Sequence, residues 1–213
     1  DAEIVVAGTL SSRARRDELR ATLQSLAGGR LISMRTDLLN TGLCRIDQSL
    51  PNVPASGIEI IFRYGGKDER NETDTYFVGE NPVIDLVLPA QIRDGHLWVS
   101  IVDVTGNVYH LLPNVNRPNN TIAALRNGAT GPVSVRVTYP VEDALTPDKL
   151  AFIVDDSALG TGKLVAFLSS GPIFAADRPS AEPVEEFAAL LADLPGDASI
   201  ISLDSRLLIT ERP

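Results

Sequence analysis

The stretch LWVSIVDVTGNVYHLL, residues 97–112, decides the fold class of this chain. Apolar residues recur at every second position from Leu97, and a second extended run covers residues 108–112. A period of two is typical of a β-strand with one buried face. Thr105-Gly106-Asn107 lies between the runs and favours a tight turn. We therefore predict an antiparallel β-hairpin at this point.

Similar runs extend over most of residues 55–213. We predict further strands at residues 58–63, 75–78, 83–88, 133–139, 150–154 and 164–168. Gly, Pro, Asn and Asp separate these runs, as is typical of an antiparallel, Ig-like β-sandwich. Gly160–Lys163 lacks the upstream glycine of a phosphate-binding loop, so we interpret it as a hairpin turn.

A helix with an apolar stripe follows the predicted sandwich. Ser180 is its expected N-cap, because a serine hydroxyl can accept a hydrogen bond from the first turn. Two late strands are predicted at residues 199–203 and 206–210. We take as a hypothesis that one of them returns to the N-terminal module and completes its sheet. The stripe comprises Val184, Phe187, Leu190, Leu191 and Leu194.

Residues 1–52 form a separate predicted module. Strands are expected at residues 3–8 and 30–35, with a helix at 13–26 between them and a short helix at 43–50. A change in charge and in proline usage puts the module boundary near Pro51–Pro54. The predicted fold class of the whole chain is therefore α+β, a small β-α-β module followed by a sandwich domain at 55–213 with a C-terminal helix.

The charge of the chain argues against two classes of partner. The 213 residues carry 19 basic and 28 acidic side chains, a net charge of −9. Residues 1–50 hold seven arginines and six acids, a net +1, so residues 51–213 carry −10. Nucleic acids and anionic membrane surfaces attract clustered Lys and Arg. We expect neither partner, and no apolar run is long enough to span a bilayer.

The N-terminal residue and the single cysteine lead to further predictions. Cys44 alone excludes an internal disulfide and a thiolate zinc cluster. The sequence begins at Asp1 rather than Met, which indicates a processed product or an excised domain. No cofactor is predicted, and the oligomeric state is left open.

Several residues are candidates for binding a partner or ligand. Trp98 lies on the opposite strand face from Leu97, so it is either a packing residue under a cover or an exposed anchor. A long loop at residues 113–131 starts at the end of the hairpin, and long loops are often functional. The candidates from the hairpin and this loop are His96, Trp98, Tyr109, Asn114, Asn116 and Arg117.

Arginines near the start of the first predicted helix are candidates for docking an anion. Arg13, Arg16 and Arg20 lie in its N-terminal half, where the helix dipole favours negative charge. A solvated helix face explains the same pattern.

Few features of the sequence indicate a catalytic site. The two histidines, His96 and His110, together with Asp103 could hold a metal, or take part in hydrolysis. We instead interpret both histidines as hydrogen-bonded sheet residues, and no nucleophile elbow is present. The acidic pair Asp155-Asp156 is interpreted as a solvated face. No catalytic residue and no metal site is therefore predicted.

Two family resemblances add to this interpretation. The pattern VDxxGNVYHLLPN at residues 102–114, with Asn119-Asn120 after it, is followed by FxSSxPIF at 167–174 and RPxxE at 178–182. These patterns resemble an uncharacterised β-sandwich domain family that is appended to bacterial serine/threonine kinases and caspase-like proteins. The resemblance covers about residues 75–195. It implies an accessory role, sensory or partner-binding, without catalytic residues.

The N-terminal module resembles a BON-like domain over about residues 1–50. The resemblance depends on IVVAGxxS at residues 4–11 and on a helix that ends at Gly28-Gly29. BON-like domains are small αβ folds, found mostly outside the bacterial cytoplasm, for which binding to partners or envelope components has been proposed. An extracytoplasmic, periplasmic location is therefore expected here, and a cytoplasmic one stays open.

The predicted function is a non-enzymatic sensory or protein-interaction region of a larger bacterial signalling or envelope protein. The C-terminal region of a serine/threonine kinase is one such context, and the expected partner is an unidentified protein or envelope component. One alternative is a hydrolase or metal-dependent enzyme that uses His96, His110 and Asp103. Another is a glycan- or cell-wall-binding sandwich that uses Trp98.

Overall fold

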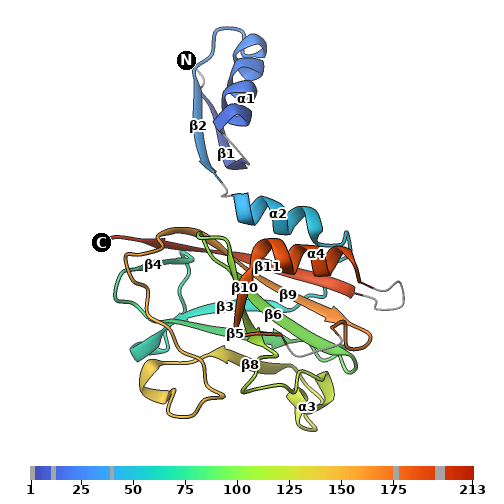
Figure 1. The fold of residues 1–213 in the computed structure, drawn as a ribbon. Helices are drawn as coiled ribbons and strands as arrows, with labels where there is room; N and C mark the ends of the chain where they lie inside the picture. Colours follow the sequence, from blue (N-terminus) through green and yellow to red (C-terminus); the bar gives the residue numbers. More distant parts are fainter. Residues whose placement is uncertain (1–2, 11–12, 39–40, 175–177, 195–199) are drawn as a thin grey trace.

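The computed structural model describes residues 3–10, 13–38, 41–174, 178–194 and 200–213. A small unit, dark blue in Figure 1, projects from a larger body that contains two sheets and a layer of helices. Ser11, the last residue of the BON-like pattern, lies outside the described residues. Among the described helices, none combines the length and the apolar character that a membrane crossing requires.

The projecting unit is a β-α-β arrangement of β1 (Ile4–Leu10), α1 (Arg13–Leu26) and β2 (Ile32–Leu38). The two strands pair in parallel along their whole length. The predicted strand, helix and strand are confirmed. The chain leaves α1 through Gly28 and Gly29, whose φ angles of +58° and +84° lie in the left-handed region that favours glycine.

Helix α2 (Thr41–Ser49) belongs to the larger body, although the sequence analysis places it in the first module. Its residues Leu43 and Ile46 are buried in one hydrophobic cluster with α4 (Val184–Ala192). A helix this short needs tertiary packing to be stable, and the body supplies the apolar surface. The boundary between the two modules therefore lies before α2, earlier than the predicted boundary at Pro51–Pro54.

Two β-sheets form the body. The larger sheet has the order β10-β7-β6-β9-β11-β4, and the smaller has the order β3-β5-β8. Neighbouring strands are antiparallel, except that β11 and β4 are parallel. The α+β class is thus confirmed, whereas the finer Ig-like arrangement is not. The bounds are β3 (Glu59–Tyr64), β4 (Thr75–Phe77), β5 (Pro82–Leu88), β6 (His96–Val102), β7 (Asn107–Leu112), β8 (Val133–Thr138), β9 (Gly160–Ser169), β10 (Ala181–Pro183) and β11 (Ile200–Glu211), with short helices η1 (Gly65–Lys67), α3 (Ile122–Arg126) and η2 (Val141–Asp143).

Each face of the larger sheet has its own hydrophobic core. Leu97, Val99 and Ile101 of β6 face the smaller sheet, as their spacing predicts. Trp98 and Val102 lie on the other face, under α2 and α4. Figure 1 shows these two helices side by side above the sheet. The body is therefore a sandwich of two sheets with a third, helical layer.

The late strands form one element and do not return to the first module. Residues 200–211 make the single strand β11, which pairs with β9 and β4. Within the described part of the chain, β1 and β2 pair only with each other. The hypothesis that a late strand completes the first sheet is therefore wrong. Strand β11 forms backbone hydrogen bonds with β9 along almost its whole length. The short strands of the first module could form fewer such bonds.

Three local predictions are corrected by long-range contacts. Residues 150–154 form no strand, because they exchange single backbone bonds with separate segments instead of pairing along a neighbour. Gly160–Lys163 is the start of β9 rather than a turn. At Gly162 a Cβ atom would lie 3.0 Å from the carbonyl oxygen of Val102, which explains a glycine inside this strand. Ser180 is not the N-cap of α4, because β10 comes between them.

Candidate functional site

Trp98 is a packing residue in this structure. Its side chain is 7% exposed and stacks on Phe167, with ring centroids 6.2 Å apart. Its Nε1–H donates to the hydroxyl oxygen of Ser169 at 2.8 Å. Phe174 contacts the ring edge-on, and the helices α2 and α4 cover this face of the sheet. Because Trp98 is buried, a glycan could not bind to its ring in this conformation and would have to bind elsewhere.

The alternative triad of His96, His110 and Asp103 does not come together. His110 lies opposite Ser100 in the hairpin, whereas His96 stands four residues earlier on β6. Four residues of strand correspond to about 13 Å. Asp103 caps the turn instead, where its Oδ1 accepts from the backbone N–H of Asn107 at 2.8 Å. Among the described residues, no three His, Cys, Asp or Glu side chains lie close enough to hold a metal.

The loop candidates form the turn after β7. Asn114 is buried, donates to the carbonyl of Leu111 at 2.8 Å, and accepts from the N–H groups of Asn116 and Arg117. Arg117 donates to the carbonyl of Arg136 at 2.7 Å. These contacts fix the shape of the loop, and Asn116 remains exposed.

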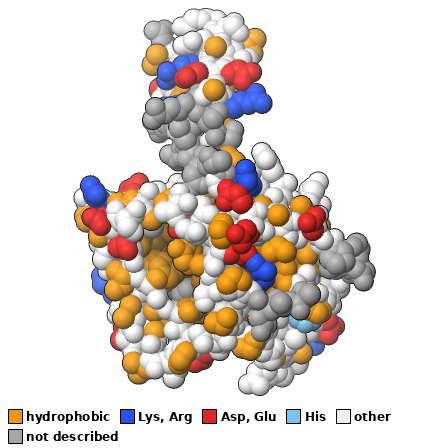
Figure 2. Space-filling view, in the orientation of Figure 1, with side chains coloured by type: hydrophobic (Ala, Val, Ile, Leu, Met, Phe, Trp, Pro, Cys, Tyr) orange, Lys and Arg blue, Asp and Glu red, His pale blue; other side chains and the backbone are white. Residues whose placement is uncertain are grey.

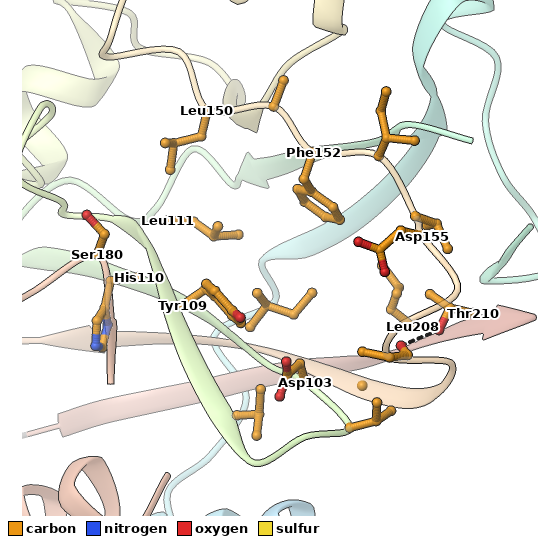
Figure 3. A pocket seen from close by; sticks show the side chains of 18 of the residues that line it. Asp103, Tyr109, His110, Leu111, Leu150, Phe152, Asp155, Ser180, Leu208 and Thr210 are labelled. Carbon is orange, nitrogen blue, oxygen red and sulfur yellow. Dashed lines mark hydrogen bonds between the residues drawn. The ribbon is translucent and has the colours of Figure 1, made fainter. Parts of the chain in front are cut away.

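A pocket of about 410 Å³ lies where the six-stranded sheet meets residues 150–158 (Figure 3). Leu111 and Leu208 line it on the side of the sheet, and Leu150 and Phe152 line it from the facing segment. Figure 2 shows a hollow bordered by hydrophobic side chains on the left of the larger body. The volume is within the range of small-ligand sites, and an apolar lining favours an apolar occupant.

Of the six partner-binding candidates, three line this pocket and three do not, and Asp103 and His110 of the enzyme alternative line it as well. Tyr109, Asn114 and Asn116 line it. The residues that line it from 150–158 were not among the candidates, because that segment has the pattern of an ordinary strand. Asp155 belongs to the acidic pair that was interpreted as a solvated face, and the pair was the only available signal. The candidates outside the pocket lining are His96, Trp98 and Arg117.

Tyr109 and the carboxylates of Asp103 and Asp155 are among the polar residues that line the pocket (Figure 3). Burial, and then the negative charges of Asp103 and Asp155, raise the pKa of the Tyr109 phenol. Hydrogen bonds from the side chain and backbone of Ser157 lower the pKa of Asp155. At neutral pH the site therefore combines a protonated phenol, which can donate a hydrogen bond, with negative charge.

Exposed apolar side chains continue from the pocket onto the surface. Tyr109 is 41% exposed and Ile153 is 53% exposed, and both line the pocket. Val115, between the lining residues Asn114 and Asn116, is 56% exposed. Apolar surface of this kind around a concave site is typical of contact with another protein.

Beneath the helical layer, a buried chain of polar groups joins β6, β7 and β10. Ser100 Oγ lies 3.0 Å from His110 Nδ1, and His110 Nε2 lies 2.7 Å from Glu182 Oε1. Arg178 donates to both carboxylate oxygens of Glu182. A neutral imidazole with its proton on Nε2 satisfies both neighbours. Ser100, His110 and Glu182 are buried, so their mutual contacts stabilise the packing, and His110 is also one of the residues that line the pocket.

Stability is expected to fall between pH 7.5 and pH 5.5 through His110. Burial lowers the pKa of His110 and outweighs the hydrogen bond to Glu182. A lowered folded pKa means that the unfolded chain takes up a proton first, so stability is lost as the pH falls below the ordinary value near 6.5. Urea unfolding at the two pH values measures the loss. In the His110→Gln variant, the difference in the free energy of unfolding between the two pH values should be smaller. An unchanged difference would contradict the role given to His110.

The arginine candidates lie on the projecting unit. Arg16 is half-buried and Arg20 is exposed, while the side chain of Arg13 lies outside the described part. The structure adds no contact that points to an anion, so their docking role stays a prediction.

Comparison of the chain with family models, curated proteins and solved structures gave no match.

Proposed function

We propose that this chain is a non-enzymatic, partner-binding region, and that its pocket receives an apolar side chain of another protein that lies beside a lysine or arginine. The observation that carries the proposal is the pocket of about 410 Å³, with apolar walls and with Tyr109 beside Asp103 and Asp155. The walls favour the apolar group, and the carboxylates favour a neighbouring cation.

A protein partner accounts for the surroundings of the pocket better than a free small molecule does. The exposed side chains of Val115 and Ile153 give a partner further apolar surface to cover. Tyr109 presents a rigid ring with a hydroxyl group, a combination that is frequent at protein interfaces. A sensory or interaction region of a larger bacterial signalling or envelope protein, outside the cytoplasm, is the context we propose, in line with the two family resemblances.

Two capped dipeptides test the occupant of the pocket. N-acetyl-leucyl-arginine amide and N-acetyl-leucyl-glutamate amide share the apolar residue and differ in the sign of the neighbouring charge. We expect the arginine peptide to bind about threefold to fivefold tighter, because an exposed ion pair contributes up to about 1 kcal/mol. Chemical shifts of the Leu111, Leu150 and Ile153 methyl groups follow the titration.

A matched pair of variants isolates the charge. Asp155→Asn keeps the oxygen that accepts from Ser157 and should remove most of the preference for arginine. Asp94→Asn removes another exposed carboxylate, located just before β6, and should leave the preference for arginine intact. Equal affinity of the two peptides, or shifts confined to residues outside the pocket, would overturn the proposal.

A further inference from the structure

The segment at residues 150–154 uses its backbone hydrogen bonds along one side. The carbonyl oxygens of Leu150 and Phe152 each accept a hydrogen bond at 2.8 Å. The N–H of Val154 donates to the carbonyl of Glu80 at 2.9 Å. The bonded residues thus alternate along the segment. This alternation is typical of an extended chain, because its successive residues direct their backbone groups to opposite sides.

The residues between them, Ala151 and Ile153, leave the other side of the segment open. Within the described part of the chain, neither residue has a hydrogen bond at its backbone N–H or C=O. Unpaired groups along an extended chain are a template for pairing with another chain. Natural edges are usually protected by charged residues, prolines or bulges, whereas residues 150–154 are apolar throughout and Ile153 is 53% exposed. The open side therefore has the features of a site for strand addition.

Other edges in the body are covered by the chain itself. Strand β10 pairs with β7, and the N–H of Asn71 donates to the carbonyl of Phe62 in the edge strand β3 at 2.8 Å. The segment at 150–154 differs from these edges because it also lines the pocket. Figure 3 shows it across the pocket from Tyr109. An added strand would therefore lie directly beside the pocket.

We propose that the partner binds as an extended peptide segment, which pairs its backbone with Ala151 and Ile153 and places one apolar side chain in the pocket. This inference rests on the function proposed above and adds the conformation of the partner. Backbone hydrogen bonds give such a complex its affinity, and pockets for individual side chains give it specificity. The carboxylates of Asp103 and Asp155 favour a partner with a lysine or arginine next to the apolar residue. A second copy of this chain fits less well, because residues 51–213 carry a net charge of −10 and two such bodies repel each other.

A longer peptide tests the backbone pairing on the full 213-residue chain. The probe is a capped hexapeptide with the leucyl-arginine pair at its centre and threonine at the other four positions. We expect it to bind at least about tenfold tighter than the capped leucyl-arginine dipeptide, because it adds backbone hydrogen bonds. In an extended peptide, the N–H groups of the leucine and the arginine point to opposite sides. N-methylation at one of these two positions should therefore weaken binding at least about tenfold, and at the other by less than about threefold.

Hydrogen exchange of the protein detects the same bonds from the side of the chain. Saturation with the hexapeptide should slow exchange at the N–H of Ala151 or Ile153 at least about tenfold, and the dipeptide should not. The N–H of Val154 already has its acceptor and is the internal control. Its exchange should change by less than about threefold.

A matched pair of variants separates the backbone from the side chain. Ile153→Pro and Ile153→Ala both remove the isoleucine side chain, but only proline also removes the N–H. We expect the proline variant to bind the hexapeptide at least about fivefold more weakly than the alanine variant does. Equal affinities of the two variants would overturn the role of this N–H.

Failure of this inference differs from failure of the proposed function. A dipeptide that shows the preference for arginine, combined with a hexapeptide that binds no tighter, two N-methylated peptides of equal affinity or unprotected amides, would overturn the extended partner alone. If neither peptide binds, both proposals are wrong. Protection of Ala151 and Ile153 that rises with the concentration of the chain, without any peptide, would identify a second copy as the occupant and would also overturn the inference.

Discussion

Asp85→Ala is expected to lower the free energy of unfolding by about 3 kcal/mol or more. Asp85 is 4% exposed in the centre of the smaller sheet, and its carboxylate accepts from Arg63 Nε at 2.8 Å and from Arg136 Nε at 2.8 Å. Removing it leaves the Arg63 guanidinium without its anion, and leaves Arg136 with only the more exposed carboxylate of Asp68. Both arginines are partly exposed and regain some hydration, so the low end of the range for buried ion pairs applies.

Urea unfolding at pH 7 measures this loss, with Asp94→Asn as the control that should change stability by less than about 0.5 kcal/mol. Acid unfolding gives an independent check. Burial alone would raise the pKa of Asp85, but the hydrogen bonds and charges of Arg136 and Arg63 outweigh burial and lower it. A lowered carboxyl pKa gives stability that is complete above the ordinary value and is lost as the pH falls through the folded value. The variant should show a flatter stability curve below pH 4, and an equally steep curve would contradict this account.

Glu182→Ala should lower the free energy of unfolding by a similar amount, about 3 kcal/mol, for a different structural reason. Glu182 joins β10 to β7 through His110 and holds Arg178 with both carboxylate oxygens. Without it, a buried imidazole loses its acceptor and a half-buried guanidinium loses its anion. We also expect α4 to become less stable locally, because the helix follows β10 directly.

Two measurements separate the global loss from the local one. Thermal unfolding gives the total change, and hydrogen exchange at Val184 N–H, which donates to the carbonyl of Gly106 at 2.8 Å, gives the local change. Glu186→Ala, on the exposed side of α4, is the matched control and should stay within about 0.5 kcal/mol of the wild type. Wild-type stability of Glu182→Ala would show that the buried polar chain contributes nothing to packing.

The sequence by itself determined the elements whose signals are local. The hairpin at 97–112 follows from alternation and from a turn with Gly106 at φ +88°, and both features lie within sixteen residues. Helix α1 and the strands beside it follow from spacing and from the glycines after the helix in the same way. The candidates Tyr109, Asn114 and Asn116 line the pocket because they belong to the same hairpin and the loop that leaves it.

Only the tertiary structure decided the features that depend on distant contacts. Residues 150–154 have the pattern of a strand, yet with the residues that follow them they form one wall of the pocket, and their backbone bonds go to separate segments instead of along one strand. The same holds for α2, whose apolar side finds its partner about 140 residues away in α4, and for Glu182, which meets His110 across 72 residues. Local periodicity records which face of a segment is apolar, but not which other segment buries it, and that choice depends on the packing of the whole chain.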